Sequence, residues 1–289
     1  MVRFRAVEIM SLRMLSIDRQ SLRIQRCVLA ILFLLIAIPL RAQNSVDDKT
    51  YNAYLDWEKA QPPSPSWDQD DLLVRYAAHL KAGGLNQNAV DQLIAGLSRR
   101  LDADESAFWD KIYAQSAEPF NALPNHLLVQ AVKGVNPGKA LEVEMGQGRN
   151  SLFLAQKGWD VTGFDFSPKA LDLAQQHAKR AGVTIHTVLS KDEDFPFGKE
   201  QWDLIAFLYP MEKRSYAKVR EALKPGGLVV VEGFHQDVHG PAVRYASNEL
   251  LNRFAGFTIL YYEDAVGLAD WGQHEVRLVK LIAKKPAAP

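Results

Sequence analysis

The feature that most limits the fold of this chain is a regular alternation of short β-rich runs with helical stretches from residue 139 onward. The β-rich runs predict seven strands, at 139–144, 159–164, 183–189, 202–208, 227–234, 256–262 and 275–283. Amphipathic stretches predict helices between them, near 149–157, 168–181, 213–223 and 247–254. Because parallel strands need crossover connections, this alternation predicts an α/β fold with a mostly parallel sheet and helices on both faces. The last two strands lack a helical connection and are expected to pair as an edge hairpin.

The region before the sheet has a different pattern. Polar residues ending in Pro62-Pro-Ser-Pro-Ser66 are typical of a linker. Two helical stretches follow, with Asp68 and Asn86 as candidate N-caps. We therefore expect a signal peptide or anchor (1–42), a linker (43–67), a helical lead-in (68–107, with helices at 68–83 and 86–100), a catalytic-type α/β domain (108–285) and a tail (286–289).

The first 42 residues are typical of an export signal. An Arg-rich stretch precedes a 12-residue apolar run, Cys27 to Ile38, and Ala42 is a small residue suited to cleavage. A membrane-spanning helix needs about 20 apolar residues, so this run is short for one. We expect export to the periplasm or the medium after cleavage at Ala42. The alternative is an uncleaved membrane anchor formed by residues 27–40.

Composition limits the partners. Lys and Arg together number 34, as do Asp and Glu, so the formal net charge is zero. Binding to nucleic acid usually needs a basic surface, and we therefore expect no nucleic-acid partner. Cys27 is the single cysteine and lies within the signal segment, so a cleaved chain has no thiol for a disulfide, a zinc site or a nucleophile. Contact with a membrane is expected only through the N-terminal segment.

A glycine loop follows the first predicted strand. In the segment from Ala140 to Ser151, Gly146 and Gly148 stand two apart just before a helix, where backbone can approach a ligand and free N–H groups face an anion. The second strand ends in Asp165, and an acid at this place can bind both hydroxyls of a ribose. Because Ser167 is the better helix cap, Asp165 is left for a ligand.

These motifs resemble those of class I S-adenosylmethionine-dependent methyltransferases. The resemblance covers the run ALEVEMGQGRNSLFLAQKGWDVTGFDFSPKAL from Ala140, then Trp202-Asp-Leu-Ile205, then Leu223-Lys-Pro-Gly-Gly-Leu-Val-Val-Val-Glu232. The GQGRN loop is most similar to small-molecule methyltransferases. The resemblance implies a Rossmann-like seven-stranded sheet, S-adenosylmethionine as cofactor and a small-molecule methyl acceptor.

The resemblance also implies roles for individual residues. Gly146 and Gly148 would line the methionine end of the cofactor, Glu142 would hold its amino group, and Asn150 belongs to the same loop. Asp165 would bind the ribose. The adenine would be bordered by Phe166 and bound through its amino group by Asp192, although Asp192 also fits a solvated charge run, and Trp109 and Tyr113 fit either a cofactor cover or a core.

Glu144 departs from the family pattern. It stands where these enzymes nearly always have the first glycine of the loop. A buried, poorly paired carboxylate costs free energy, so we expect Glu144 to lower the affinity for the cofactor and to weaken catalysis.

The candidate catalytic residues follow the fourth and fifth strands. They are Tyr209 and His235, with His239 nearby, at the sheet edge where open α/β folds bind ligands. Tyr209 also fits a pocket wall, and His235 also fits a structural histidine. No His, Asp and Glu spacing indicates a metal site.

Two other functions compete with methyl transfer. A nicotinamide-dependent oxidoreductase would have GxGxxG, but Ser151 occupies the third glycine position. The stronger alternative is a non-catalytic periplasmic binding or interaction protein that retains the fold, which both the export signal and Glu144 favour.

Overall fold

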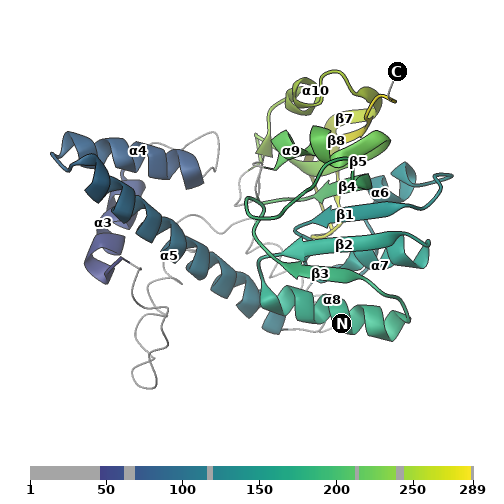
Figure 1. The fold of residues 1–289 in the computed structure, drawn as a ribbon, viewed down its shortest axis with the longest axis horizontal. Helices are drawn as coiled ribbons and strands as arrows, with labels where there is room; N and C mark the ends of the chain where they lie inside the picture. The colour runs from purple at the N-terminus through teal and green to yellow at the C-terminus, as the bar shows by residue number, and fades with distance from the viewer. Residues whose placement is uncertain (1–45, 62–68, 116–119, 212–214, 239–243, 288–289) are drawn as a thin grey trace. The chain divides into compact units, whose positions relative to one another are not determined.

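The computed structural model describes residues 46–61, 69–115, 120–211, 215–238 and 244–287. The predicted signal segment, Asp68 and His239 lie outside these ranges. The described chain divides into two compact units, one that ends at Phe108 and one that begins at Trp109. In Figure 1 the first is helical and the second contains the sheet. Among the helices of the described ranges, none is long and apolar enough to cross a membrane.

The helical unit is larger than its sequence pattern predicted. Helix α3 (Asp48–Lys59) lies in the segment interpreted as a linker, so that interpretation is wrong for these residues. Asp47 caps α3 by accepting a hydrogen bond from the Thr50 N–H, and Tyr51, Tyr54 and Leu55 form its buried stripe. Helix α4 (Gln69–Ala82) agrees with the prediction.

Helix α5 (Gln87–Ala114) begins as predicted but continues well beyond residue 100. Asn86 accepts a hydrogen bond from the Ala89 N–H, which confirms it as the cap. No Gly or Pro lies between residues 101 and 114, so nothing in the sequence ends the helix earlier. Its last residues, from Trp109, belong to the sheet unit.

The sheet is mostly parallel, as the sequence predicted. Its strands lie in the order β3-β2-β1-β4-β5-β8-β7, and β1 to β5 run parallel (Figure 1). The bounds are β1 Lys139–Val143, β2 Asp160–Asp165, β3 His186–Leu189, β4 Trp202–Leu208, β5 Leu223–His235, β7 Thr258–Ala269 and β8 His274–Lys284. Strands β7 and β8 form the expected antiparallel hairpin. An additional two-residue strand, β6 (Arg244–Tyr245), pairs with β5 and was not predicted.

Helices cover both faces of the sheet because strand side chains alternate between them. One face packs on α9 (Tyr216–Ala222) and α10 (Glu249–Arg253), and its core includes Phe207, Val231 and Leu281. The other packs on α6 (His126–Ala131), α7 (Arg149–Gln156) and α8 (Pro168–Ala181), with Leu204, Val230 and Ile282 in its core. The resulting three-layer arrangement places the carboxyl ends of β1, β2 and β4 side by side at one end of the sheet.

Candidate functional site

A cavity opens at the carboxyl ends of strands β1, β2 and β4. It encloses about 1030 Å³ including its open mouth. Its walls come from the end of α5, the loop before α6, the glycine loop and the tip of the β7–β8 hairpin. The lining residues are Trp109, Tyr113, Phe120, Glu142, Glu144, Met145, Gly146, Gln147, Arg149, Asn150, Asp165, Phe166, Leu208, Tyr209, Met211 and Trp271.

Glu142 lies in the last part of β1 and is buried. Its two carboxylate oxygens accept hydrogen bonds from Asn150 Nδ2 at 2.8 Å and Ser151 Oγ at 2.5 Å. Burial raises the pKa of Glu142, and these two bonds oppose that rise. A carboxylate can accept about four hydrogen bonds, so Glu142 can also accept one from a ligand amino group.

The glycine loop turns by left-handed backbone at two glycines. Gly146 has φ +53°, and a Cβ there would lie 2.7 Å from the Tyr113 hydroxyl. The loop therefore packs closely against the end of α5. Gly148 has φ +80° and precedes α7, where a Cβ would meet the Ala174 Cβ at 2.9 Å. Gly148 is not among the residues that line the cavity, and its close packing against α8 explains why glycine stands there.

Asp165 closes β2 at the cavity wall. Its carboxylate accepts hydrogen bonds from the Gly146 N–H at 2.8 Å and the Ser167 N–H at 2.9 Å. Ser167 itself caps α8 by accepting from the Ala170 N–H, with Pro168 as the first helical residue, which confirms that interpretation. Burial raises the pKa of Asp165 to about 6. Asp165 is thus fixed by backbone donors while facing the cavity.

Glu144 occupies a conformation that favours glycine. Its φ is +52°, which explains why glycine is usual at this position. Its carboxylate accepts a hydrogen bond from the Met211 N–H at 2.6 Å. This bond fixes the first residues after β4 against the end of β1. Glu144 is therefore held in place, and it also lines the cavity.

Tyr209 follows β4 directly and lines the cavity with φ +60°. Its hydroxyl donates a hydrogen bond to Glu232 and accepts one from the Asp270 N–H at 3.2 Å. Glu232 is buried in β5, and its other oxygen accepts from Asn125 Nδ2 at 3.0 Å. Burial raises the pKa of Glu232 and also that of Tyr209, where the nearby carboxylates add to the rise. The Tyr209 hydroxyl is thus fixed by Glu232 and by the Asp270 N–H.

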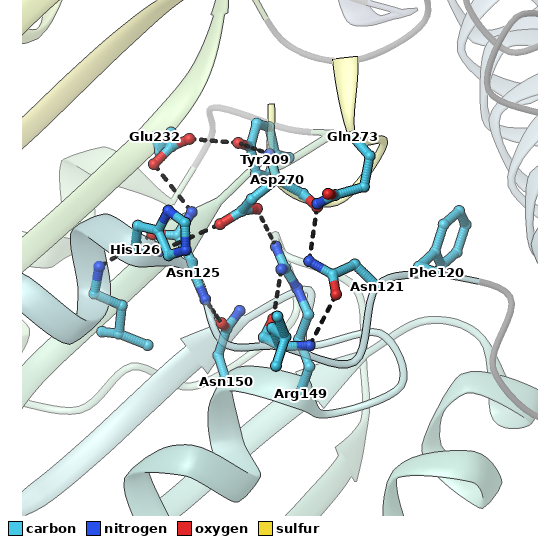
Figure 2. A network of polar contacts seen from close by, with 12 residues as sticks. Phe120, Asn121, Asn125, His126, Arg149, Asn150, Tyr209, Glu232, Asp270 and Gln273 are labelled. Atoms are coloured by element: carbon cyan, nitrogen blue, oxygen red, sulfur yellow. Dashed lines mark hydrogen bonds and ion pairs between the residues drawn. The ribbon is translucent and has the colours of Figure 1, made fainter. Parts of the chain in front are cut away.

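A polar network joins the loop before α6 to the hairpin tip, as Figure 2 shows. Arg149 donates to Asp270 at 2.7 Å and to the Leu123 carbonyl at 2.8 Å. The other Asp270 oxygen accepts from the His126 N–H at 3.2 Å. Asn121 Nδ2 donates to the Asp270 carbonyl at 2.9 Å. Arg149 and Asp270 are both largely buried, so the glycine loop and the hairpin are bound by a desolvated ion pair.

The structure brings most of the predicted site residues together. Glu142, Glu144, Gly146, Asn150, Asp165, Phe166 and Tyr209 all line the cavity. The aromatic residues that the sequence could also place in the core, Trp109 and Tyr113, line it too.

Two other predicted site residues do not line the cavity. Asp192 is buried and accepts from the Ser215 N–H at 3.0 Å, which contradicts the alternative of a solvated charge run. His235 is buried, with Nε2 3.1 Å from the Ser247 hydroxyl and Nδ1 accepting from the Asp237 N–H. The structural interpretation of His235 therefore fits better than the catalytic one, because these contacts occupy both ring nitrogens.

Sequence reasoning missed the contribution of the hairpin. Trp271 and Asp270 lie more than 100 residues from the glycine loop in sequence, and no local motif connects them. Gln147 was overlooked although it stands inside the GQG motif. Its Nε2 donates to the Phe120 carbonyl at 3.2 Å, and its buried Oε1 has no hydrogen-bond partner. Within the described ranges, no cluster of side chains could hold a metal ion.

With this geometry established, comparison with known proteins identifies the domain. Residues 140–227 match the methyltransferase domain family. The chain carries a class I S-adenosylmethionine-dependent methyltransferase domain. This is the family whose motifs the sequence resembles.

Individual relatives align with about half of this chain. The chain is 30% identical over 178 residues to hemagglutinin 1 of Eikenella corrodens, covering 54% of this chain and 58% of that protein. It is 30% identical over 152 residues to a "probable S-adenosyl-L-methionine-dependent methyltransferase TehB" of Haemophilus influenzae, covering 48% and 53%. The chain thus spans about half the length of these curated relatives.

One solved structure aligns with this chain with a TM-score of 0.51. It comes from a study of the conversion of a disulfide bond into a thioacetal group during echinomycin biosynthesis. It is 18% identical and covers 64% of this chain and 94% of that one. This likeness shows the shared fold of the methyltransferase domain.

Proposed function

We propose that this methyltransferase domain binds S-adenosylmethionine in the cavity and transfers its methyl group to a small-molecule acceptor. The observation that carries the proposal is the convergence of Glu142, Gly146 and Asp165 on one cavity at the ends of the neighbouring strands β1 and β2. S-adenosylmethionine supplies an activated methyl group for in-line displacement, so the protein contributes mainly alignment.

The residues of the chain divide this work by position. Asp165 binds the ribose hydroxyls with the carboxylate that its backbone donors hold in place. Glu142 holds the amino group, and Phe166 borders the adenine. Tyr209 orients the acceptor at the opposite wall, because its hydroxyl lies at the end of β4 and is fixed by Glu232 and Asp270.

Calorimetry with S-adenosylmethionine and S-adenosylhomocysteine tests the proposal. Both should bind the purified chain, and Asp165→Ala should weaken binding by about 1–3 kcal/mol because it removes charged hydrogen bonds. Asp172→Ala is a matched control, since Asp172 is exposed on α8 and does not line the cavity. Absence of binding at millimolar ligand would refute the proposal.

A second candidate function is binding without catalysis, which the unusual Glu144 favours. Glu144 replaces the usual glycine and places a carboxylate in the cavity wall. In that case the chain binds S-adenosylmethionine and S-adenosylhomocysteine, but it transfers no methyl group to an acceptor of any class. Methyl transfer to any acceptor in a mixed panel of thiols, amines and phenols would exclude it.

We also propose that the chain is exported. The Arg-rich stretch, the 12-residue apolar run and Ala42 support this, with anchoring by residues 27–40 as the alternative. N-terminal sequencing of the chain from a native-like host should begin at Gln43. A cytosolic chain that retains its first residues would contradict export, and a membrane-bound one would support the anchor.

A further inference from the structure

Two polar atoms of the described cavity lining are buried without a hydrogen-bond partner. They are Gln147 Oε1, which is an acceptor, and Trp271 Nε1, which is a donor. The Gln147 residue as a whole is only 3% exposed. Buried polar groups in folded proteins are almost always hydrogen-bonded, so an unpartnered acceptor and an unpartnered donor in one cavity wall require an explanation. A ligand that supplies both missing partners would explain them together.

The orientation of the Gln147 amide follows from its other contacts. Its Nε2 donates to the carbonyls of Phe120 at 3.2 Å and Asn121 at 3.4 Å. Because a carbonyl can only accept, the nitrogen end of the amide must face these two groups. Oε1 is therefore the unpartnered end, and only a donor can satisfy it. The indole Nε1–H of Trp271 is a donor only, so it needs an acceptor.

Both residues contact Phe120, which places them in the same part of the cavity wall. Gln147 bonds to the Phe120 carbonyl, and the Trp271 ring lies edge to face with the Phe120 ring, with centroids 5.3 Å apart. The Asn121 side chain also donates to the carbonyl of Asp270, directly before Trp271 (Figure 2). Tyr113 packs on Phe120 at 5.7 Å, so aromatic rings surround the two unpartnered atoms and suit a flat ligand.

The charged side chains of the described lining already have polar partners within the chain. Glu142 accepts from Asn150 and Ser151, Glu144 accepts from the Met211 N–H, Asp165 accepts from the Gly146 N–H, and Arg149 pairs with Asp270. None of these four charges needs a ligand to obtain a partner. The hydrogen-bonding capacity that the chain itself leaves unused at the buried atoms of this wall is neutral.

From this arrangement we infer that the acceptor subsite takes a neutral aromatic molecule with a carboxamide-type edge, in which an N–H stands beside a C=O. The inference rests on the proposed function, because it names the substrate class of that site. The N–H donates to Gln147 Oε1, and the C=O accepts from Trp271 Nε1. A carboxylate has no proton to give Gln147, and an amidinium has no lone pair for Trp271, so either would leave one buried atom unpartnered.

Four probes of one shape test the subsite without knowledge of the natural acceptor. Benzamide donates and accepts, acetophenone only accepts, benzamidine is a cation that only donates, and benzoate is an anion that only accepts. Each is titrated into the full chain with and without saturating S-adenosylhomocysteine, and binding is followed by calorimetry. Benzamide should bind about three- to tenfold more tightly than each of the others, the effect expected for one hydrogen bond.

Two variants connect this ranking to the two atoms. Trp271→Phe keeps an aromatic ring but removes the donor, so it should weaken benzamide and acetophenone about three- to tenfold and leave benzamidine unchanged. Gln147→Met keeps the length of the side chain but removes the acceptor, so it should weaken benzamide and benzamidine and leave acetophenone unchanged. In each variant the unchanged probe shows that the cavity is intact.

Matched substitutions away from the cavity are the controls. Trp57→Phe lies in the helical unit, and Gln130→Met replaces an exposed residue of α6. Neither residue lines the cavity, and neither substitution should change the ranking of the probes. Proton–nitrogen NMR adds a direct measurement, with the Trp271 indole signal assigned by its loss in Trp271→Phe. That signal should move downfield with benzamide and acetophenone but not with benzamidine.

The outcomes separate this inference from the proposed function. Equal or tighter binding of any other probe by the wild-type chain, or no binding of benzamide at millimolar concentration, would overturn the carboxamide subsite. A variant that weakens all four probes equally would do the same, because the two atoms would then have no selective role. Failure of S-adenosylhomocysteine to bind would instead contradict the proposed function, and the ranking of the probes without it still decides the subsite.

Discussion

At the scale of single residues, the titration of Asp165 gives the sharpest expectation. Ribose hydroxyls donate hydrogen bonds, so the ligand prefers the ionised carboxylate. Burial raises the pKa of Asp165 to about 6 in the ligand-free chain, and below that value binding must first release a proton. Affinity for S-adenosylhomocysteine should therefore rise with pH and be roughly tenfold weaker at pH 5 than at pH 7.5.

Calorimetry across that pH range, in buffers of different ionisation enthalpy, measures both the affinity and the proton released. Asp165→Asn cannot ionise and should bind weakly without this pH dependence. If wild type and Asp165→Asn show the same pH profile, another group titrates and Asp165 is not the ribose ligand.

Glu144 has a strained backbone and a stabilising side-chain hydrogen bond. The free energies of these two effects determine how a substitution at this position changes the stability of the fold. A left-handed φ costs a non-glycine residue about 1–2 kcal/mol, whereas its charged bond to the Met211 N–H contributes about 1.5–3 kcal/mol. Glu144→Gly should thus destabilise the fold slightly. Glu144→Ala loses the bond and keeps the strain, so it should be less stable than Glu144→Gly by about 0.5–1 kcal/mol.

Urea denaturation of the two variants tests this order. At most sites Ala is the more stable of the two, so the reversal is specific to left-handed backbone. An Ala variant more stable than the Gly variant would show that residue 144 leaves this conformation. In line with the sequence, Glu144→Gly should also bind S-adenosylhomocysteine more tightly, because a carboxylate near the ligand carboxylate is removed.

At the scale of elements, the sequence predicted those whose boundaries are set locally. Strand β4 and helix α8 have the predicted bounds because Trp202 begins an apolar run and Ser167-Pro168 is a strong helix start. Helix α6 and strand β6 were missed. The former is six residues long and capped by Asn125, and the latter exists only through its pairing with β5. Short elements of this kind depend on tertiary contacts that no local pattern contains.

The candidate site divides in the same way. Gly146 and Asp165 could be placed from sequence because they end consecutive strands. The aromatic residues of the cavity lining could be predicted only in part, since Trp271 reaches the cavity through the hairpin and the Arg149–Asp270 pair.

That ion pair is the element-scale contact with the largest expected effect on stability. The side chains of Arg149 and Asp270 are 9% and 4% exposed, so removal of one partner leaves a buried charge. Arg149→Met should lower the free energy of unfolding by about 3–5 kcal/mol. Lys169→Met removes the exposed pair with Asp172 and should cost about 1 kcal/mol or less.

Chemical denaturation of both variants and of Arg149→Met/Asp270→Leu measures the contribution. The double variant should recover part of the loss, because no charge is then left unpaired. Equal losses for Arg149→Met and Lys169→Met would show that water reaches the pair and that it does not bind the hairpin to the glycine loop.

At the scale of the whole molecule, the chain contains two compact units with separate cores. Tyr54 and Leu97 belong to the core of the helical unit, and Phe207 belongs to the core of the sheet unit. The described cavity lining belongs entirely to the sheet unit. A bound ligand stabilises only the part of the chain that unfolds together with the ligand site. Its effect therefore shows whether the two units unfold together or separately.

S-adenosylhomocysteine at 100 times its dissociation constant should stabilise the sheet unit by about 2.7 kcal/mol. In hydrogen exchange, this should slow the amides of β1, β4 and β5 by roughly 100-fold where they exchange through unfolding of that unit. The amides around Tyr54 and Leu97 should change far less, because their core is separate. Asp165→Ala, measured at the same ligand concentration, controls for effects unrelated to the site. Equal slowing in both cores would mean that α5, which continues from one unit into the other, makes them unfold as one cooperative structure.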